Sequence, residues 1–315
     1  MHHIVFLDQG SLPMVLKPLQ SPHTWHDYPQ TGPEDVVSRL QGATIAVVNK
    51  VRLTAEILAS LPGLKMIAIA ATGSDNIDLV YCKAHGIVVS NIRNYALDTV
   101  PEHALAMLFA LRRSLPGWQK DIAAGKWQTS PHFCLFDYPI LDIADSTLGI
   151  IGSGSLGQSL ARKAQALGMK VLFADRKDAT MIRDGFTAFD DVLQQSDAIS
   201  LHCPLTPQTK DLMGAREFGL MRAHAILLNT ARGALVHADA LLAALRTGQI
   251  GGAGIDVLPE EPPRQGHPFL DANLPNLLVT PHVAWSSQQA MRKLADQLVD
   301  NMDAFIAGTP QNRLA

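Results

Sequence analysis

Short apolar runs alternate with amphipathic stretches in two separate parts of the chain. In the first part, strands are predicted at residues 4–7, 44–48, 65–70 and 86–89, and helices at 34–41, 54–60 and 76–84. Thr54 is a residue type that caps helix amino termini. Five prolines between residues 13 and 33 predict that this region is largely loop. Strands and helices in alternation favour a parallel sheet.

The same alternation returns after a polar stretch at residues 120–145. Strands are predicted at 147–151, 170–174, 198–201, 225–229, 252–256 and 277–280, with helices that include 156–167 and 238–247. A closing helix at 288–307 has no following strand, so we expect it to return to the first domain. The helix at 100–113 is apolar on almost every side, with Pro101 at its first position. We expect this helix to be buried and to link the two domains.

Composition excludes several classes of protein. Of 315 residues, 47% are hydrophobic and 17% charged, as in ordinary α/β proteins, and this length predicts about two domains. A net charge of −3 leaves no basic surplus for a nucleic-acid partner. No apolar stretch reaches the length of a membrane span. Three scattered cysteines match neither a disulfide framework nor a metal site, and they favour the cytoplasm.

A glycine-rich turn, Gly152-Ser-Gly154-Ser155-Leu156-Gly157, joins a predicted strand to a predicted helix. The first glycine permits a tight turn, the second lets a pyrophosphate approach, and the third lets the helix pack on the strand. The helix amino terminus then offers unpaired N–H groups to phosphate. A purely structural turn is the alternative, but the flanking elements favour dinucleotide binding.

Asp175 follows the next strand, where a ribose-binding carboxylate belongs. It favours NAD over NADP because a carboxylate repels a 2′-phosphate. Arg176 and Lys177 are able to turn and hold that phosphate, so NADP stays open as an alternative.

Arg232, Glu261 and His282 lie in three patches downstream of the glycine turn. A cation binds an anionic substrate, an imidazole carries a proton, and a carboxylate tunes the imidazole, which together suit hydride transfer. Arg232 alone would be a surface ion-pair partner, and His282 alone a loop histidine. Glu260 competes with Glu261 for the carboxylate role.

These motifs together resemble the D-isomer-specific 2-hydroxyacid dehydrogenases over nearly the whole chain. The residues that carry the resemblance are 152–157, 201–206, 228–233, 254–257, 261–262 and 280–282. Within the family, residues 49–54, 71–78 and 281–286 are most similar to the glycerate dehydrogenase and hydroxypyruvate reductase group.

The resemblance implies an α/β fold with two parallel-sheet domains. Residues 1–99 and 287–315 would form a discontinuous, flavodoxin-like substrate domain, and residues 100–286 a Rossmann dinucleotide-binding domain. The implied reaction is NAD(P)H-dependent reduction of a small 2-oxo acid, hydroxypyruvate or glyoxylate, to the D-2-hydroxy acid, and the reverse oxidation. A cytoplasmic homodimer without a metal is expected.

Site roles also follow from the resemblance. Arg232 would bind the substrate carboxylate, His282 would exchange the proton, and Glu261 would fix the tautomer of His282 and favour its protonated form. The cofactor would contact Gly152, Gly154, Ser155, Leu156, Gly157, Asp175, Arg176, Cys203, Pro204, Thr209, Thr230, Ala231, Asp256 and His282. The substrate would contact Asn49, Thr72, Gly73, Arg232 and His282. Asp256 would orient the nicotinamide carboxamide, and His103 is expected to be a hydrogen-bonded core histidine.

The sequence departs from the family pattern at two positions and leaves two alternative functions open. Ser155 stands where many relatives carry a basic residue, and Leu258 replaces an aromatic residue. A phosphoglycerate dehydrogenase-like activity is one alternative, since Lys50 and Arg52 would suit a phosphorylated substrate. A non-catalytic NAD(H)-sensing protein is the other, although it would have no need for Arg232, Glu261 and His282 together.

Overall fold

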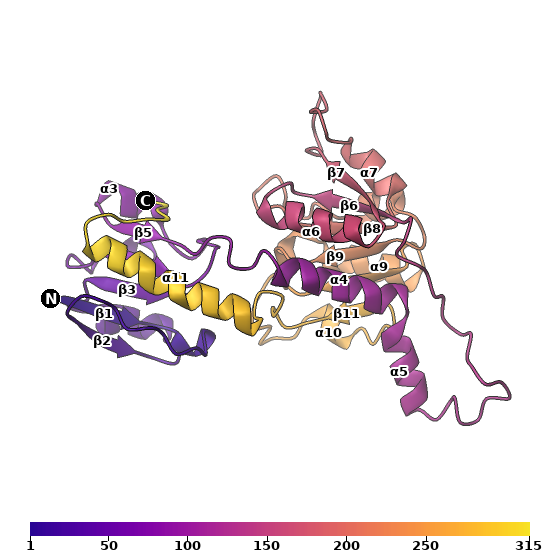
Figure 1. The fold of residues 1–315 in the computed structure, drawn as a ribbon, viewed down its shortest axis with the longest axis horizontal. Coiled ribbons are helices and arrows are strands. Elements are labelled where there is room, and N and C mark those ends of the chain that lie inside the picture. Colours follow the sequence, from indigo (N-terminus) through magenta and orange to yellow (C-terminus); the bar gives the residue numbers. More distant parts are fainter. The chain divides into compact units, whose positions relative to one another are not determined.

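The computed structural model describes residues 1–315 and divides into two compact units. Unit 1 comprises Met1–Tyr95 and Ser287–Ala315, and unit 2 comprises Ala96–Ser286 (Figure 1). Unit 1 is therefore discontinuous in sequence. Each unit has its own parallel sheet with helices around it, as the predicted α/β fold class requires.

Unit 1 contains five parallel strands in the order β2-β1-β3-β4-β5. The strands are β1 (His2–Phe6), β2 (His23–Asp27), β3 (Ile45–Val48), β4 (Met66–Ile69) and β5 (Val88–Ser90), and the helices are α1 (Val36–Leu40), α2 (Ala55–Ala59), α3 (Leu79–Ala84) and α11 (Gln288–Ile306). Short 3₁₀ turns occupy Gln9–Ser11 and Pro33–Asp35. This strand order is that of flavodoxin-like sheets, as predicted.

The prediction that residues 13–33 are largely loop missed β2. This edge strand pairs in parallel with β1, with His2 opposite His23 and Phe6 opposite Asp27. Its prolines lie outside it, at Pro22 and Pro29, where they remove no ladder hydrogen bond. Flanking prolines therefore limit the length of an edge strand without abolishing it.

The core of unit 1 forms where apolar strands meet amphipathic helices. Every residue of β3 and β4 is buried, which explains their unbroken apolar sequence. Helix α11 packs against β4 and buries Leu294, Leu298 and Val299. Thr54 caps α2 as predicted, its hydroxyl accepting the amide of Ile57.

Unit 2 contains six parallel strands in the order β11-β10-β9-β8-β6-β7. The strands are β6 (Thr147–Ile151), β7 (Lys170–Ala174), β8 (Ala198–Leu201), β9 (Ile226–Asn229), β10 (Gly252–Ile255) and β11 (Leu277–Val279). The helices are α4 (Thr99–Arg112), α5 (Leu115–Ala123), α6 (Ser155–Ala166), α7 (Phe189–Gln195), α8 (Ala215–Leu220), α9 (Ala238–Arg246) and α10 (Pro268–Asp271), with a 3₁₀ turn at Gly233–Leu235.

Strand order in unit 2 reverses between β6 and β8. Strand β7 lies on one side of β6 and β8 on the other, so the sheet extends from β6 in both directions. Thr187 adds a parallel bridge to Ala174 at the edge of β7. This strand order is the doubly wound Rossmann arrangement, whose ligands bind at the carboxyl ends of the strands beside the reversal. The glycine turn follows β6 at that point.

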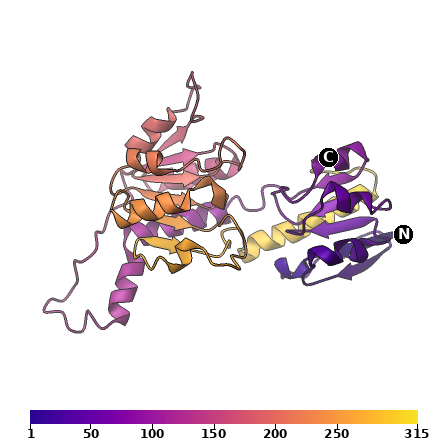
Figure 2. The ribbon, with the colours of Figure 1, turned by 180° about the vertical axis from the view of Figure 1, so that it is seen from behind.

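Two predictions around the start of unit 2 need correction. Helix α4 begins at Thr99, so Pro101 is its third residue, still within the first turn, where a missing N–H costs nothing. The helix packs on β9, β10 and α6 and lies wholly within unit 2, so it follows the junction at Tyr95 instead of spanning it. The pattern also missed α5, after which residues 124–146 form the long loop seen in Figure 2.

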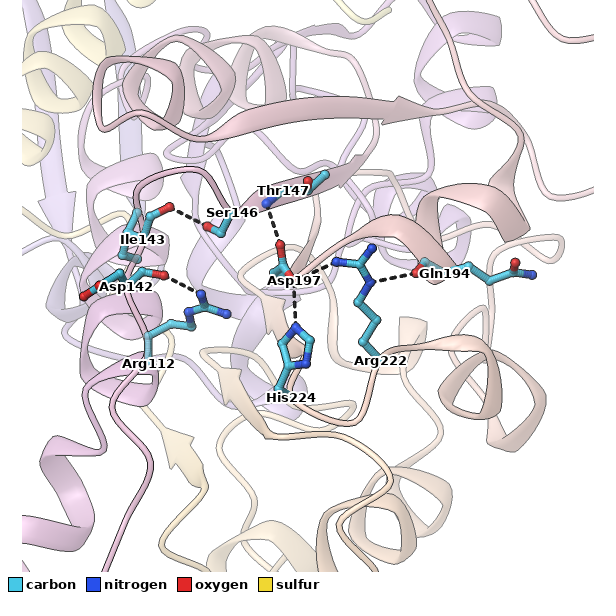
Figure 3. Close-up of polar contacts among 9 residues, drawn as sticks. All are labelled: Arg112, Asp142, Ile143, Ser146, Thr147, Gln194, Asp197, Arg222 and His224. Carbon is cyan, nitrogen blue, oxygen red and sulfur yellow. Dashed lines mark hydrogen bonds and ion pairs between the residues drawn. The ribbon is translucent and has the colours of Figure 1, made fainter. Parts of the chain in front are cut away.

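An ion-pair network ties the amino-terminal ends of β6, β8 and β9 together (Figure 3). Asp197 accepts hydrogen bonds from the amide of Thr147 (2.7 Å), Nη1 of Arg222 (2.9 Å) and Nε2 of His224 (2.7 Å). Burial favours the protonated acid, but these hydrogen bonds outweigh it and hold the pKa of Asp197 below its usual value. Burial lowers the pKa of nearby Arg112, an effect that the charge of Asp197 opposes.

No helix in the structure is both long enough and apolar enough to cross a membrane. The longest helix, α11, is too polar.

Candidate active site

In the turn between β6 and α6, the surroundings of each glycine fit the role predicted for that residue. Gly152 has φ +110°, and a Cβ there would lie 2.5 Å from the carbonyl carbon of His202. A Cβ on Gly157 would lie 2.1 Å from the carbonyl oxygen of Gly152, so helix and strand approach too closely for any side chain. A Cβ on Gly154 would meet nothing within 4 Å. The turn therefore leaves open space in front of the α6 amino terminus, where a pyrophosphate fits.

A cavity of about 1050 Å³ lies in unit 2 beside this turn. Six predicted cofactor residues line it, namely Gly152, Asp175, Arg176, Cys203, Pro204 and Thr209. They come from the carboxyl ends of β6, β7 and β8 and the segments that follow. Gly154, Ser155, Leu156 and Gly157 continue from Gly152 into α6. The observed cavity is thus where a doubly wound sheet binds its ligand.

Asp175 has a partner that sequence reasoning missed. Nε of Arg183 donates to its Oδ1 at 2.8 Å, and the Arg183 amide donates to its Oδ2 at 2.8 Å. Hydrogen bonds from the Arg183 side chain and amide hold the pKa of Asp175 well below its usual range. Arg183 also lines the cavity. Its position eight residues downstream, in a loop, carries no motif by which the sequence alone would identify it.

The segment after β8 presents backbone and neutral side chains to the cavity. Burial raises the pKa of the Cys203 thiol to about 11, so the thiol is neutral at physiological pH and is a poor nucleophile. Burial lowers the pKa of His202 to about 4, and Ser200 Oγ lies 2.8 Å from its Nε2. The Thr209 hydroxyl donates to the Pro204 carbonyl at 2.7 Å and closes the turn.

Arg232 lies in a turn directly after β9. The Asn229 side chain holds this turn by donating to the Arg232 carbonyl (2.8 Å) and accepting the Ala231 amide (3.1 Å). A Cβ on Gly233 would lie 2.1 Å from the carbonyl carbon of Leu258, so this turn packs directly on the backbone that leads to Glu261. That close contact explains the glycine after Arg232.

The hydroxyl of Thr230, in the same turn, is buried and has no hydrogen-bond partner within the chain. Buried polar atoms without partners are uncommon in folded proteins and call for an explanation such as a ligand. This orphaned atom therefore fits the predicted contact between Thr230 and a dinucleotide.

Glu261 and His282 form a direct pair. Nδ1 of His282 lies 2.5 Å from Oε2 of Glu261, and the two side chains are 28% and 29% exposed. The other carboxylate oxygen of Glu261 accepts the Leu258 amide at 2.8 Å. His282 has φ +54°, an uncommon conformation outside glycine, and its amide donates to the Asp256 carbonyl at 2.8 Å. Of the two neighbouring glutamates, it is Glu261 that reaches the imidazole.

Asp256 stabilises the loop that carries His282. Its buried carboxylate accepts the Thr280 hydroxyl (2.5 Å), the Val283 amide (2.9 Å) and the Ala284 amide (3.0 Å). His103 is hydrogen-bonded as predicted, with Nε2 3.0 Å from Thr280 Oγ1. The predicted carboxamide contact of Asp256 stays a prediction, and the contacts present connect this carboxylate to both sides of His282.

The predicted substrate residues of unit 1 lie after β3 and β4. Asp8, after β1, accepts the amide of Asn49 at 2.8 Å, and the Asn49 side chain donates to Ser11 Oγ at 2.9 Å. Asn49 is thus bound into the turn. The backbone amides of Thr72 and Gly73 donate to no acceptor within the chain, so they are available to an anion.

No group of three or more histidine, cysteine or acidic side chains is arranged to hold a metal ion. The chemistry available at the site is that of the arginine, the glutamate–histidine pair and the cavity beside the glycine turn.

Comparison with known proteins identifies the family. Residues 105–284 match the family model of the D-isomer specific 2-hydroxyacid dehydrogenase NAD binding domain. The chain belongs to the D-isomer-specific 2-hydroxyacid dehydrogenases. It is 54% identical to the glycerate dehydrogenase of Methylorubrum extorquens, over 98% of each chain. The predicted family and the predicted class, an NAD-dependent oxidoreductase, are confirmed.

Two further members of this dehydrogenase family illustrate its range. The chain is 34% identical to a hydroxypyruvate reductase of Blautia hydrogenotrophica, over 90% of this chain and 88% of that one. A D-lactate dehydrogenase from Aquifex aeolicus, solved with NAD and lactic acid, is 28% identical, with a TM-score of 0.79 and coverage of 97% of this chain and 96% of that one.

Proposed function

We propose that this dehydrogenase reduces hydroxypyruvate or glyoxylate to the D-2-hydroxy acid with NADH and also catalyses the reverse oxidation. The observation that carries the proposal is the 2.5 Å contact between His282 and Glu261, in the same unit as the dinucleotide cavity. The named activities of the glycerate dehydrogenase and hydroxypyruvate reductase relatives support the choice of substrate.

The cavity residues and the glycine turn are proposed to hold the dinucleotide. The open space at Gly154 and the orphaned hydroxyl of Thr230 both support that assignment. When bound, NADH supplies the hydride that reduces C2 of the 2-oxo acid. The amides of Ser155 and Leu156, at the start of α6, are free of partners inside the helix and would bind the pyrophosphate.

His282 is proposed as the proton donor in reduction. Because the carboxylate of Glu261 is an acceptor, Nδ1 of His282 carries its proton toward Glu261, and Nε2 is the atom that exchanges a proton with substrate. As the carbonyl carbon gains the hydride, Nε2 gives its proton to the oxygen, and the product is a hydroxyl. In oxidation the same nitrogen takes the hydroxyl proton.

Arg232 is proposed to bind the carboxylate of the 2-oxo acid. Its guanidinium is permanently charged and planar, and it matches a carboxylate in geometry as well as charge. The side chain donates to the Ala231 carbonyl at 2.8 Å through Nη1, which restrains its stem beside the turn. In unit 1, the available backbone amides of Thr72 and Gly73 are proposed to bind a carboxylate by donating hydrogen bonds to it.

Oxidation of NADH followed at 340 nm tests the proposal. The enzyme would be assayed with hydroxypyruvate, glyoxylate, pyruvate and 3-phosphohydroxypyruvate, with the His282→Ala variant as control. We expect the highest kcat/KM with hydroxypyruvate or glyoxylate and almost no turnover by the variant. Tight NADH binding without turnover of any 2-oxo acid would instead indicate an NAD(H)-sensing protein.

We also propose that the enzyme is a cytoplasmic homodimer. Phe133 and Phe136, in the loop after α5, are 90% and 83% exposed, as expected for side chains that a second copy covers. Sedimentation velocity should give twice the chain mass, and Phe133→Ser with Phe136→Ser should give the monomer. Three free cysteines support a reducing compartment, which cell fractionation would test.

A further inference from the structure

Asp175, at the end of β7, is surrounded by N–H donors from its own chain. Oδ1 accepts the Arg176 amide (2.8 Å) and Nε of Arg183 (2.8 Å), and Nη2 of Arg183 lies 2.7 Å from the same oxygen. Oδ2 accepts the Arg183 amide at 2.8 Å. The side chain is only 2% exposed. A carboxylate offers about four acceptor positions, so little capacity remains for a ribose hydroxyl.

The loop that carries Arg183 is held in place from several sides. The guanidinium of Arg183 stacks on the Phe186 ring, 3.9 Å from its centroid. Thr187 then returns the chain to the sheet, its amide donating to the Phe173 carbonyl at 2.8 Å and its carbonyl accepting the Asp175 amide at 2.9 Å. The pair between Arg183 and Asp175 therefore closes a loop whose two ends are already paired.

This pairing changes the charge that a nucleotide meets. A free carboxylate at the end of this strand favours NAD because it accepts from the ribose and repels a 2′-phosphate. Here Arg183 cancels that charge. The Arg176 side chain is exposed and has no partner within the chain, and it lines the same cavity. Lys177 and Asp178 also line the cavity, but Nζ of Lys177 is paired with Oε1 of Glu217 at 2.9 Å, so Arg176 is the cation of this rim that a phosphate would meet.

We infer that Arg183 is a specificity-determining residue that neutralises Asp175, so that the enzyme binds NADPH as well as NADH. The inference rests on the proposed dinucleotide site. Arg176 is the side chain placed to hold the 2′-phosphate, and Arg183 removes the repulsion that would otherwise exclude it. Asp175 by itself thus does not select NAD in this chain.

Binding measurements test the inference apart from turnover. Dissociation constants for NADH and NADPH would be measured by isothermal titration calorimetry and by the fluorescence of the reduced nicotinamide. For the wild-type enzyme we expect the two constants to differ by less than about tenfold. In Arg183→Gln and Arg183→Ala the freed carboxylate should weaken NADPH binding by about tenfold or more, with NADH bound as tightly as before or more tightly.

Arg246→Gln is the matched control because it removes the same charge from an exposed position at the end of α9, outside the cavity lining. Its NADPH to NADH ratio should equal that of the wild type, and thermal melting would show that each variant folds. A wild-type enzyme that prefers NADH by more than a hundredfold, or a ratio unchanged in both Arg183 variants, would overturn the inference alone. If neither nucleotide binds, the proposed dinucleotide site fails and the inference fails with it.

Discussion

Nδ1 of His282 lies 2.5 Å from Oε2 of Glu261, while the second oxygen of that carboxylate accepts the Leu258 amide. The carboxylate is thereby held by its own loop and presents one oxygen to the imidazole. The His282 amide is bound in turn to the Asp256 carbonyl. Both partners are anchored through backbone contacts, so the ring orientation does not depend on two freely rotating side chains.

His282→Ala should lower kcat by about 10²- to 10⁴-fold, because the nascent alkoxide then has no general acid. The dissociation constant for NADH should stay within about twofold, since removal of the imidazole alters only the reacting end of the cofactor site. Steady-state kinetics and calorimetry would measure both quantities. His26→Ala, an exposed histidine on β2, serves as control and should behave as wild type. Normal turnover by the His282 variant would remove this residue from the mechanism.

Glu261→Gln should lower kcat by about tenfold or more, because an amide oxygen is a weaker acceptor for the imidazole N–H than a charged carboxylate oxygen. Glu260→Gln is the matched control, because Glu260 is the exposed neighbour with no contact to the imidazole. Steady-state kinetics of the two variants would separate their roles. Equal kcat values for wild type and Glu261→Gln would argue against the coupling.

Thr280→Val should lower kcat by about tenfold or more while leaving the KM for NADH almost unchanged. Its hydroxyl donates to Asp256, whose carboxylate binds the amides on the carboxyl side of His282, so the variant loosens the loop that positions the imidazole. Thr280→Ser retains the hydroxyl and should restore most of the activity. A serine variant as impaired as the valine variant would mean that the hydrogen bond is not the cause.

Gly157→Ala and Gly154→Ala should affect different properties. The first should lower stability, and the second should lower the affinity for NADH. The methyl group at position 157 would overlap the Gly152 carbonyl oxygen, so we expect about 1–3 kcal/mol of destabilisation, or a Tm roughly 2–12 °C lower. A methyl group at position 154 enters open space and should leave Tm within about 2 °C, but it should weaken NADH binding by obstructing the pyrophosphate. Differential scanning calorimetry and NADH titration would test both expectations. Equal loss of stability in the two variants would contradict the different roles.

Asp197→Asn should cost about 2 kcal/mol of unfolding free energy at pH 7, because the charged hydrogen bonds to Arg222 and His224 are lost. The pKa of Asp197 is lowered in the folded state, so its stabilisation is present above the unfolded value near 4 and is lost as pH falls below it. The difference between wild type and variant should therefore shrink below about pH 4.

Urea unfolding between pH 7 and pH 3.5 would measure that difference. Glu56→Gln, an exposed acid on α2, is the control and should change stability by less than about 0.5 kcal/mol. A difference between wild type and Asp197→Asn that does not vary with pH would show that the charge of Asp197 is not what stabilises the strand ends.

Local sequence was sufficient for most elements and for the glycine turn. The buried strands β3 and β4 are uninterrupted apolar runs, and the roles of Gly152 and Gly157 follow from spacing to the flanking strand and helix. Edge and junction features were harder to predict. Strand β2 lies between prolines and most of its residues are polar, so its sequence does not indicate a strand. Its pairing with β1 is what makes it one. Its pairing partner lies 21 residues away, beyond any local pattern.

The sequence by itself determined the family and the alternation of strands and helices, because each depends on residue types within short segments. It also predicted Arg232, Glu261 and His282 as the site residues, each from the short motif around it. For other polar side chains, such as Asp175 and Asp256, only the tertiary structure decided which groups they bind. Asp175 is bound by Arg183 across a loop, and Asp256 binds the Ala284 amide 28 residues further on. A hydrogen bond is set by the distance between two atoms in the folded chain, and separation in sequence does not determine that distance.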